Sequence, residues 1–139
     1  MLPTHLYTYG TLQLPEIMSQ IVGRAVLGRA ARLSGFARYR IRDRVYPAIV
    51  ESPGAQLSGV VYDGLGPEEL VRLDDYEGPI YERRVVEIEV DGDVLLACTY
   101  VLRPEHAARL STEPWDLERF EREHLASYLA RIAVTLRAP

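Results

Sequence analysis

Glu77 is the residue whose type and position most clearly suggest chemistry. It follows Leu70 and Leu73 at helical spacing, so the three side chains share one stripe of a predicted helix. A carboxylate on an apolar stripe is costly to bury unless it is paired, and its desolvation raises its pKa. A general base that works near neutral pH needs such a raised pKa. Glu77 is therefore the candidate catalytic acid/base.

The same residues allow two other interpretations of Glu77. If the helix ends earlier than we expect, Glu77 lies in a solvated turn and pairs with Arg83 or Arg84. Alternatively, Asp74 stands three residues before Glu77, and the two could form the carboxylate pair of a hydrolase. Nothing else in the chain suggests a glycosidase-like cleft, so the second alternative is the weaker one.

The element that must position Glu77 is a helix predicted from Pro67 onward. Glu68 and Glu69 suit the positive N-terminal end of a helix, and Gly78 followed by Pro79 provides a stop. We therefore expect Glu77 in the last helical turn.

A second candidate region follows the first predicted strand, His5 to Tyr9. The strand runs directly into Gly10, Thr11 and Leu12, and a helix is predicted over 16–22. A junction of this kind exposes unpaired backbone N–H groups, which can hold a carboxylate or a developing oxyanion. Most strand–glycine–helix junctions are only turns, so the pattern alone does not identify a ligand site.

The rest of the chain predicts further strands and a C-terminal helix. Strands are expected over 32–41, 45–50, 56–63, 85–90 and 94–102, and Asp91–Gly92 joins the last two as a hairpin. A short irregular or helical piece lies between Pro104 and Pro114, and Asp116 caps a long helix. The inner stripe of that helix holds Leu117, Phe120, His124, Tyr128, Leu129, Ile132 and Leu136. About six strands with two or three helices predict one α+β domain over 1–139, whose strands hide their edges by closing into a barrel.

Four arginines alternate with apolar residues in the predicted strand around 38–45. Arg38, Arg40, Arg42 and Arg44 would share one face, which could attract an anionic ligand. The commoner explanation is a solvated outer face beside acidic neighbours, and we favour it for all of them but Arg44.

Composition excludes several classes of function. In 139 residues, 47% are hydrophobic and 26% charged, as in a globular domain, and the net charge of −4 argues against nucleic acids and anionic membranes as partners. No apolar run reaches membrane-spanning length, and residues 1–5 lack the regions of a signal peptide. We therefore expect a cytoplasmic protein.

Residue types that are missing or isolated narrow the chemistry further. All 16 basic residues other than histidine are arginine, and the absence of lysine excludes Schiff-base chemistry, pyridoxal phosphate and a Walker-type phosphate loop. His5, His106 and His124 have no metal-like spacing, so no metal site is expected. Cys98 is the only cysteine and stands in an apolar run, where a buried structural role is commoner than a catalytic one.

Several short motifs, in this order, resemble the gamma-glutamylcyclotransferase-like superfamily. They are Tyr9–Leu12, Val45–Ile49, Gly59–Tyr62, Leu73–Gly78 with Tyr81–Arg83 behind it, and Tyr100–Val101. The segment Trp115–Phe120 with His124–Leu125 is similar to the plant avirulence-induced-gene-like branch. The resemblance covers residues 6 to about 130. It implies a small mixed, mostly antiparallel β-barrel flanked by helices, with one cavity at its mouth.

The resemblance also implies an activity and a set of site residues. In characterised relatives the loop that matches Tyr9, Gly10, Thr11 and Leu12 binds a γ-glutamyl head, and the residue that matches Glu77 is the acid/base. Tyr81 matches less closely and would contact the substrate through its hydroxyl.

The implied enzyme is a cyclising acyltransferase that needs no cofactor. By intramolecular aminolysis it would release 5-oxoproline and an amine or amino acid from a small γ-glutamyl compound. The alternative is a non-catalytic domain that holds a γ-glutamyl or other small carboxylate ligand in the same cavity. The sequence specifies neither the leaving amine nor the oligomeric state.

Overall fold

Five strands form a closed barrel in the computed structural model, which describes residues 4–137 and their side chains as far as Ala133. The strands are β1 (Thr4–Thr8), β2 (Gly28–Arg40), β3 (Pro47–Leu65), β4 (Tyr81–Val90) and β5 (Asp93–Leu102). Their order around the barrel is β1-β3-β2-β4-β5, and neighbours are antiparallel except for β1 and β5, which pair in parallel at Leu6 and Cys98. The predicted α+β class and the mixed, mostly antiparallel sheet are confirmed.

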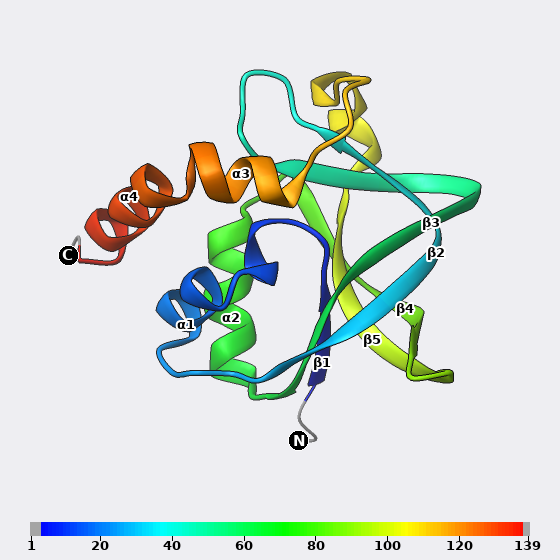
Figure 1. Cartoon of the computed structure of the whole chain (residues 1–139), viewed down its shortest axis with the longest axis horizontal. Coiled ribbons are helices and arrows are strands. Elements are labelled where there is room, and N and C mark those ends of the chain that lie inside the picture. The colour runs from blue at the N-terminus through cyan, green and yellow to red at the C-terminus, as the bar shows by residue number, and fades with distance from the viewer. Residues whose placement is uncertain (1–3, 138–139) are drawn as a thin grey trace.

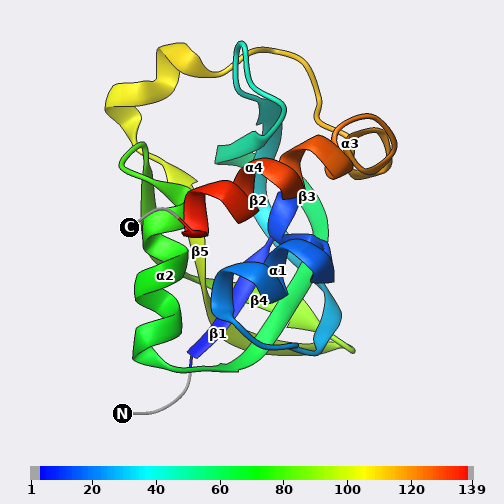
Figure 2. The same ribbon diagram turned by 90° about the vertical axis from the view of Figure 1, so that its left-hand side faces the viewer.

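Helices cover one side of the barrel (Figure 1). They are α1 (Pro15–Val22), α2 (Pro67–Glu77), α3 (Leu117–Glu123) and α4 (Leu125–Arg137), with short 3-10 turns η1 (Thr11–Gln13) and η2 (Pro104–Arg109). Figure 2 looks onto this side and shows α4 crossing above α1, toward α2. Within the described part of the chain, no helix has the length and apolar character needed to cross a membrane.

The alternation of side chains along the strands builds two apolar clusters. One consists of strand residues that fill the barrel, among them Tyr7, Leu33 and Val61. The other joins the outer face of the barrel to the helices and includes Leu6 and Leu73, both fully buried. Because neighbouring residues of a strand point to opposite faces, β1 contributes Leu6 to one cluster and Tyr7 to the other.

The β4–β5 hairpin agrees with the prediction. Asp91 and Gly92 both have positive φ, 52° and 83°, and the strands pair from Val90–Asp93 outward. Positive φ at both central residues is the geometry of the two-residue turns that match the twist of a hairpin.

The prediction of two strands over 45–50 and 56–63 was wrong, because both belong to the single strand β3. The sequence between them contains a proline and Gly54, whose φ is 85°, and this pattern is typical of a turn. In the structure, residues 52–55 form a bulge opposite β2, and the same two strands pair on both sides of it. The barrel therefore has one strand fewer than the six expected.

The long C-terminal helix predicted from Asp116 is divided at His124 into α3 and α4. The Asp116 carboxylate does cap α3, by accepting a hydrogen bond from the Glu118 N–H at 3.1 Å. His124 has a φ of −129°, and the rings of Phe120 and Tyr128 lie 5.2 Å apart on either side of it. Eight residues of straight helix would separate those rings by about 12 Å along the axis, so the contact requires the bend. Leu136, which we placed on the inner stripe, lies outside the described side chains.

The four alternating arginines do not share one strand face. Strand β2 ends at Arg40, so Arg42 and Arg44 lie in the turn that follows. Arg38 donates to the Tyr9 carbonyl at 2.7 Å, and Arg40 forms an ion pair with Glu113 at 2.7 Å. Only the two arginines of the turn remain available to an anion.

Candidate active site

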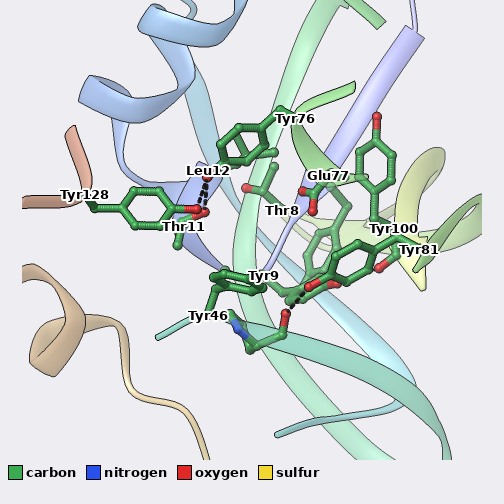
Figure 3. A pocket seen from close by; sticks show the side chains of 13 residues that line it. Thr8, Tyr9, Thr11, Leu12, Tyr46, Tyr76, Glu77, Tyr81, Tyr100 and Tyr128 are labelled. Atoms are coloured by element: carbon green, nitrogen blue, oxygen red, sulfur yellow. Dashed lines mark hydrogen bonds between the residues drawn. The ribbon is translucent and has the colours of Figure 1, made fainter. Parts of the chain in front are cut away.

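One pocket brings together the residues that the sequence analysis singled out. Tyr9, Gly10, Thr11, Leu12, Glu77 and Tyr81 all line it, at the end of the barrel where β1 stops and β4 begins (Figure 3). Its volume is about 140 Å³. Pockets that enclose drug-sized ligands measure roughly 300–1,000 Å³, so this one suits a small group attached to a larger molecule.

Helix α2 places Glu77 at the edge of this pocket. The Glu69 carboxylate accepts the Gly66 N–H at 3.0 Å and fixes the start of the helix. One turn before Glu77, Leu73 is fully buried. Gly78, with a φ of 87°, ends the helix immediately after Glu77. The predicted helix boundaries and the predicted position of Glu77 in the last turn are therefore correct.

Burial, with a smaller contribution from the nearby Asp74 charge, raises the pKa of Glu77 to about 8. The C-terminal end of α2 also disfavours a negative charge. Glu77 keeps some exposed surface, since it also borders a neighbouring hollow, but burial still dominates its pKa. Among the described side chains, which extend to Ala133, no hydrogen bond or ion pair holds its carboxyl group.

The solvated ion pair considered for Glu77 does not form. Arg83 pairs instead with Asp74 at 3.0 Å, and Arg84 pairs with Glu51 at 3.2 Å. Asp74 also accepts a hydrogen bond from the Tyr100 hydroxyl at 2.6 Å. Because these partners already hold the Asp74 carboxylate, it is poorly placed to share a proton with Glu77 as a hydrolase pair would.

The loop from Gly10 to Leu12 forms the opposite wall. The buried Tyr62 hydroxyl donates to the Leu12 carbonyl at 2.7 Å and anchors the loop to β3. A Cβ atom on Gly10 would lie 3.0 Å from the Pro47 side chain, so this close packing favours glycine. The first hydrogen bond of the η1 turn comes from Gln13 N–H to the Gly10 carbonyl, at 3.1 Å. The Thr11 and Leu12 N–H groups precede it, at the end of a turn where donors lack partners within the turn.

Tyrosines make most of the remaining wall. Seven of the nine tyrosines in the chain line the pocket: Tyr7, Tyr9, Tyr46, Tyr76, Tyr81, Tyr100 and Tyr128. The Tyr9 hydroxyl donates to the Tyr100 carbonyl at 2.6 Å, and the Tyr81 hydroxyl donates to the Pro47 carbonyl at 2.8 Å. Burial raises the pKa of both phenols, so they stay neutral. With their protons already donated, these oxygens can only accept, and acceptors beside aromatic rings suit a cationic group.

Three hydroxyls on the other side of the pocket bond to one another. The Tyr76 hydroxyl lies 2.7 Å from the Thr11 hydroxyl and 2.7 Å from the Tyr128 hydroxyl (Figure 3). Thr11 also contributes a hydrogen bond to Tyr128, so the three hydroxyls can satisfy one another. Because a hydroxyl can rotate, one of the three protons can turn instead toward an acceptor in the pocket, such as a carboxylate oxygen.

Most of this tyrosine wall is not predicted by the sequence. Tyr46 and Tyr76 occur inside the family motifs given above, and Tyr128 lies on the predicted helical stripe. Their presence in motifs and on a buried stripe could have marked them as pocket residues. Nothing in their spacing along the sequence, however, shows that they converge on one cavity.

The other candidate nucleophiles and ligands lie elsewhere. Cys98 and the three histidines are not among the residues that line this pocket. Within residues 4–137, no three His, Cys, Asp or Glu side chains gather in an arrangement that could hold a metal ion.

Comparisons with known proteins relate this geometry to a family. The family model described as gamma-glutamyl cyclotransferase, AIG2-like, matches residues 6–117. AIG2-like protein C of Arabidopsis thaliana is 36% identical over 121 residues, which cover 86% of this chain and 69% of that protein. A solution structure of another Arabidopsis thaliana protein superposes with a TM-score of 0.73 at 28% identity, covering 98% of this chain and 83% of that one.

A more distant structure, that of a gamma-glutamyl cyclotransferase, shares the fold. Its TM-score is 0.68 at 18% identity, and the match covers 94% of this chain and 86% of that one. The family model ends at residue 117, so Tyr128, which helps to close the pocket, lies beyond the region that it describes.

Proposed function

The chain belongs to the gamma-glutamyl cyclotransferase, AIG2-like family, and on that premise we propose that it cyclises the γ-glutamyl group of a small molecule to 5-oxoproline. The other product is an amine or amino acid. One observation carries the proposal: the unpaired Glu77 carboxyl, with a pKa raised to about 8, faces the Gly10–Leu12 loop across a small pocket. The composition supports a cytoplasmic location for this reaction.

The glutamyl group would bind through its two charged ends. Its α-ammonium would lie against the tyrosine rings and the accepting hydroxyls of Tyr9 and Tyr81, within reach of Glu77. Its α-carboxylate would accept from the Thr11 and Leu12 N–H groups and from one hydroxyl of the cluster turned toward it. In this assignment the ammonium group meets the tyrosine wall, and the carboxylate meets the wall formed by the Gly10–Leu12 loop and the hydroxyl cluster.

The chemistry needs one group that first takes and then gives protons. Glu77, as a carboxylate, removes a proton from the α-ammonium, and the freed amine attacks the γ-carbonyl carbon. The tetrahedral carbon then loses the amide nitrogen as Glu77 returns this first proton to that nitrogen. Glu77, again a carboxylate, takes the second proton from the new ring nitrogen and passes it to the departing amine, which leaves as an ammonium group, so two protons are moved and the protons balance.

Two effects would supply most of the rate enhancement. Proton transfer by a positioned carboxyl contributes about 10²–10⁴-fold. Nucleophile and electrophile belong to one molecule, so a pocket that folds the glutamyl chain into the ring-forming conformer can provide an effective concentration of about 10⁵ M or more. The close packing of the pocket suits it to select that conformer.

The test is to incubate the protein with a panel of γ-glutamyl compounds and to detect 5-oxoproline by mass spectrometry. Release of 5-oxoproline together with an equal amount of amine supports the proposal. Stoichiometric binding of a γ-glutamyl compound without product would instead favour the binding domain considered above.

A further inference from the structure

A second hollow adjoins the pocket at Glu77. Its volume is about 390 Å³, and both cavities are lined by Tyr46 and Glu77. Under the proposed function, Glu77 returns a proton to the departing nitrogen, so the bond that breaks must lie beside it. The half of the substrate that leaves would then extend into the second hollow.

Three arginines line this hollow, and none of them has a carboxylate partner among the residues that the structure describes. Arg42, Arg44 and Arg109 all border it and are all exposed. Seven other arginines form ion pairs with Asp or Glu: Arg24, Arg29, Arg40, Arg83, Arg84, Arg119 and Arg122. In a chain with a net charge of −4, a group of arginines that no described carboxylate neutralises leaves a local positive field.

The side chains of these arginines remain largely available. The Arg44 side chain donates to the neighbouring Asp43 carbonyl at 3.0 Å and to no other described group, and Arg109 donates to His106 Nδ1 at 3.1 Å. The Arg42 side chain has no partner among the side chains described as far as Ala133. Asp43 borders the hollow too, but its carboxylate forms no ion pair with any described basic group.

Backbone hydrogen bonds hold the two arginine-bearing segments together. The Arg42 N–H donates to the Arg109 carbonyl at 2.8 Å, and Ile41 pairs with Leu110 as an isolated bridge. The guanidinium groups therefore extend from a fixed base, although the segments lie far apart in the sequence. This reduces the conformational entropy lost when they bind an anion.

We propose that the second hollow binds the leaving half of the substrate and that Arg42, Arg44 and Arg109 select leaving halves with negative charge. The preferred class is an acidic amino acid or short acidic peptide joined to the γ-glutamyl group. Guanidinium groups bind carboxylates through paired, charge-assisted hydrogen bonds, which a neutral amine cannot form. This inference rests on the proposed function and specifies its substrate class.

A series of substrates graded by charge tests the inference. Values of kcat/KM would be measured for γ-glutamylethylamide, γ-glutamylalanine and γ-glutamylglutamate, whose leaving halves carry none, one and two carboxylates. We expect a rise of about 5- to 30-fold along the series at low salt, weakening in 0.5 M NaCl. ε-(γ-Glutamyl)lysine, whose carboxylate is offset by an ammonium group, should fall near the neutral member.

Variants locate the effect. The double variant Arg42→Gln/Arg109→Gln should flatten the series, so that kcat/KM for γ-glutamylglutamate falls toward the value for the ethylamide measured with the same variant. Arg122→Gln, which removes an exposed arginine of α3, is the matched control and should leave the series intact. A charge preference that survives in the double variant would overturn the inference.

Binding separates failure of the inference from failure of the proposed function. Dissociation constants for the same series would be measured by calorimetry with the Glu77→Gln variant. If wild-type protein forms no 5-oxoproline but binding tightens with charge, the proposed function fails and the anion site stands. If 5-oxoproline forms equally fast from all members, the function stands and the inference is refuted. If neither product nor charge-graded binding is found, both fail.

Discussion

Replacing Glu77 by glutamine should change the pH dependence of folding stability, and the sign follows from its raised pKa. The pKa is about 8 in the folded protein against an ordinary value of 4.5. Between these values the folded state keeps a proton that the unfolded state has released. Stability from this group is therefore fully present below pH 4.5 and is lost as pH rises toward and through 8. Glutamine has nearly the same shape and does not titrate, so the variant should escape this loss.

The two pKa values give the size of the effect. Their difference, 8 − 4.5 = 3.5 units, corresponds to about 5 kcal/mol in total, of which about 4 kcal/mol falls between pH 5 and pH 9. The pocket admits water, so we expect roughly half of that, about 2 kcal/mol. For a chain of this length, this is a difference in Tm of about 6 °C.

The assay is urea and thermal denaturation at pH 5, 7 and 9, followed by circular dichroism. We expect Glu77→Gln and wild type to differ little at pH 5, and the variant to be the more stable by about 2 kcal/mol at pH 9. Glu82→Gln, at an exposed position of β4, is the control and should follow wild type throughout. If Glu77→Gln also follows wild type at every pH, the carboxyl is solvated and its pKa is ordinary.

Three further substitutions test other parts of the site and fold. Asp74→Asn removes a charge that raises the pKa of Glu77, so the rise of kcat/KM with pH should move to lower pH, and an unmoved profile would contradict this electrostatic account. Tyr128→Phe removes a hydroxyl that bonds to Tyr76 and should raise KM about 3- to 10-fold with a smaller change in kcat; an unaltered KM would exclude the hydroxyl cluster from binding. Gly59→Ala would overlap the Thr8 carbonyl of the facing strand and should lower stability by about 2 kcal/mol in urea denaturation, whereas wild-type stability would show that the β1–β3 contact is loose.

The position of Glu77 could be predicted because it depends on short-range rules. Proline at the start, glycine after the end and the spacing from Leu70 through Leu73 together define one helix and one stripe. Its raised pKa follows from the same stripe, since a carboxyl among apolar side chains loses hydration. The β4–β5 hairpin was equally accessible, because Asp91–Gly92 suits a two-residue turn.

Features that depend on long-range packing could not be predicted in this way. The division of the C-terminal helix at His124 is not marked by proline or glycine, and it accompanies a ring contact between Phe120 and Tyr128. The tyrosine wall of the pocket comes from strands and helices distant in sequence. Only the closed barrel places these side chains around one cavity.

The turn that carries Arg42 and Arg44 was predicted only in part from the sequence. The sequence marked Arg44 as a candidate for anion binding but assigned Arg42 to a solvated face. In the structure β2 ends at Arg40, so Arg42 lies in the turn beside Arg44. A backbone hydrogen bond from Arg42 holds Arg109 at the same hollow. Since Arg109 lies far along the chain, its place there depends on tertiary structure.

The rate of 5-oxoproline formation by Glu77→Gln, measured beside wild type on the fastest substrate of the panel, tests the central claim most directly. The dissociation constant of the same substrate would be measured in parallel. We predict a fall in turnover of about 10²- to 10⁴-fold with a dissociation constant within a few-fold of wild type, because the variant loses proton transfer and keeps the pocket. Wild-type turnover in the variant would contradict the assignment of Glu77 as the acid/base and with it the proposed mechanism.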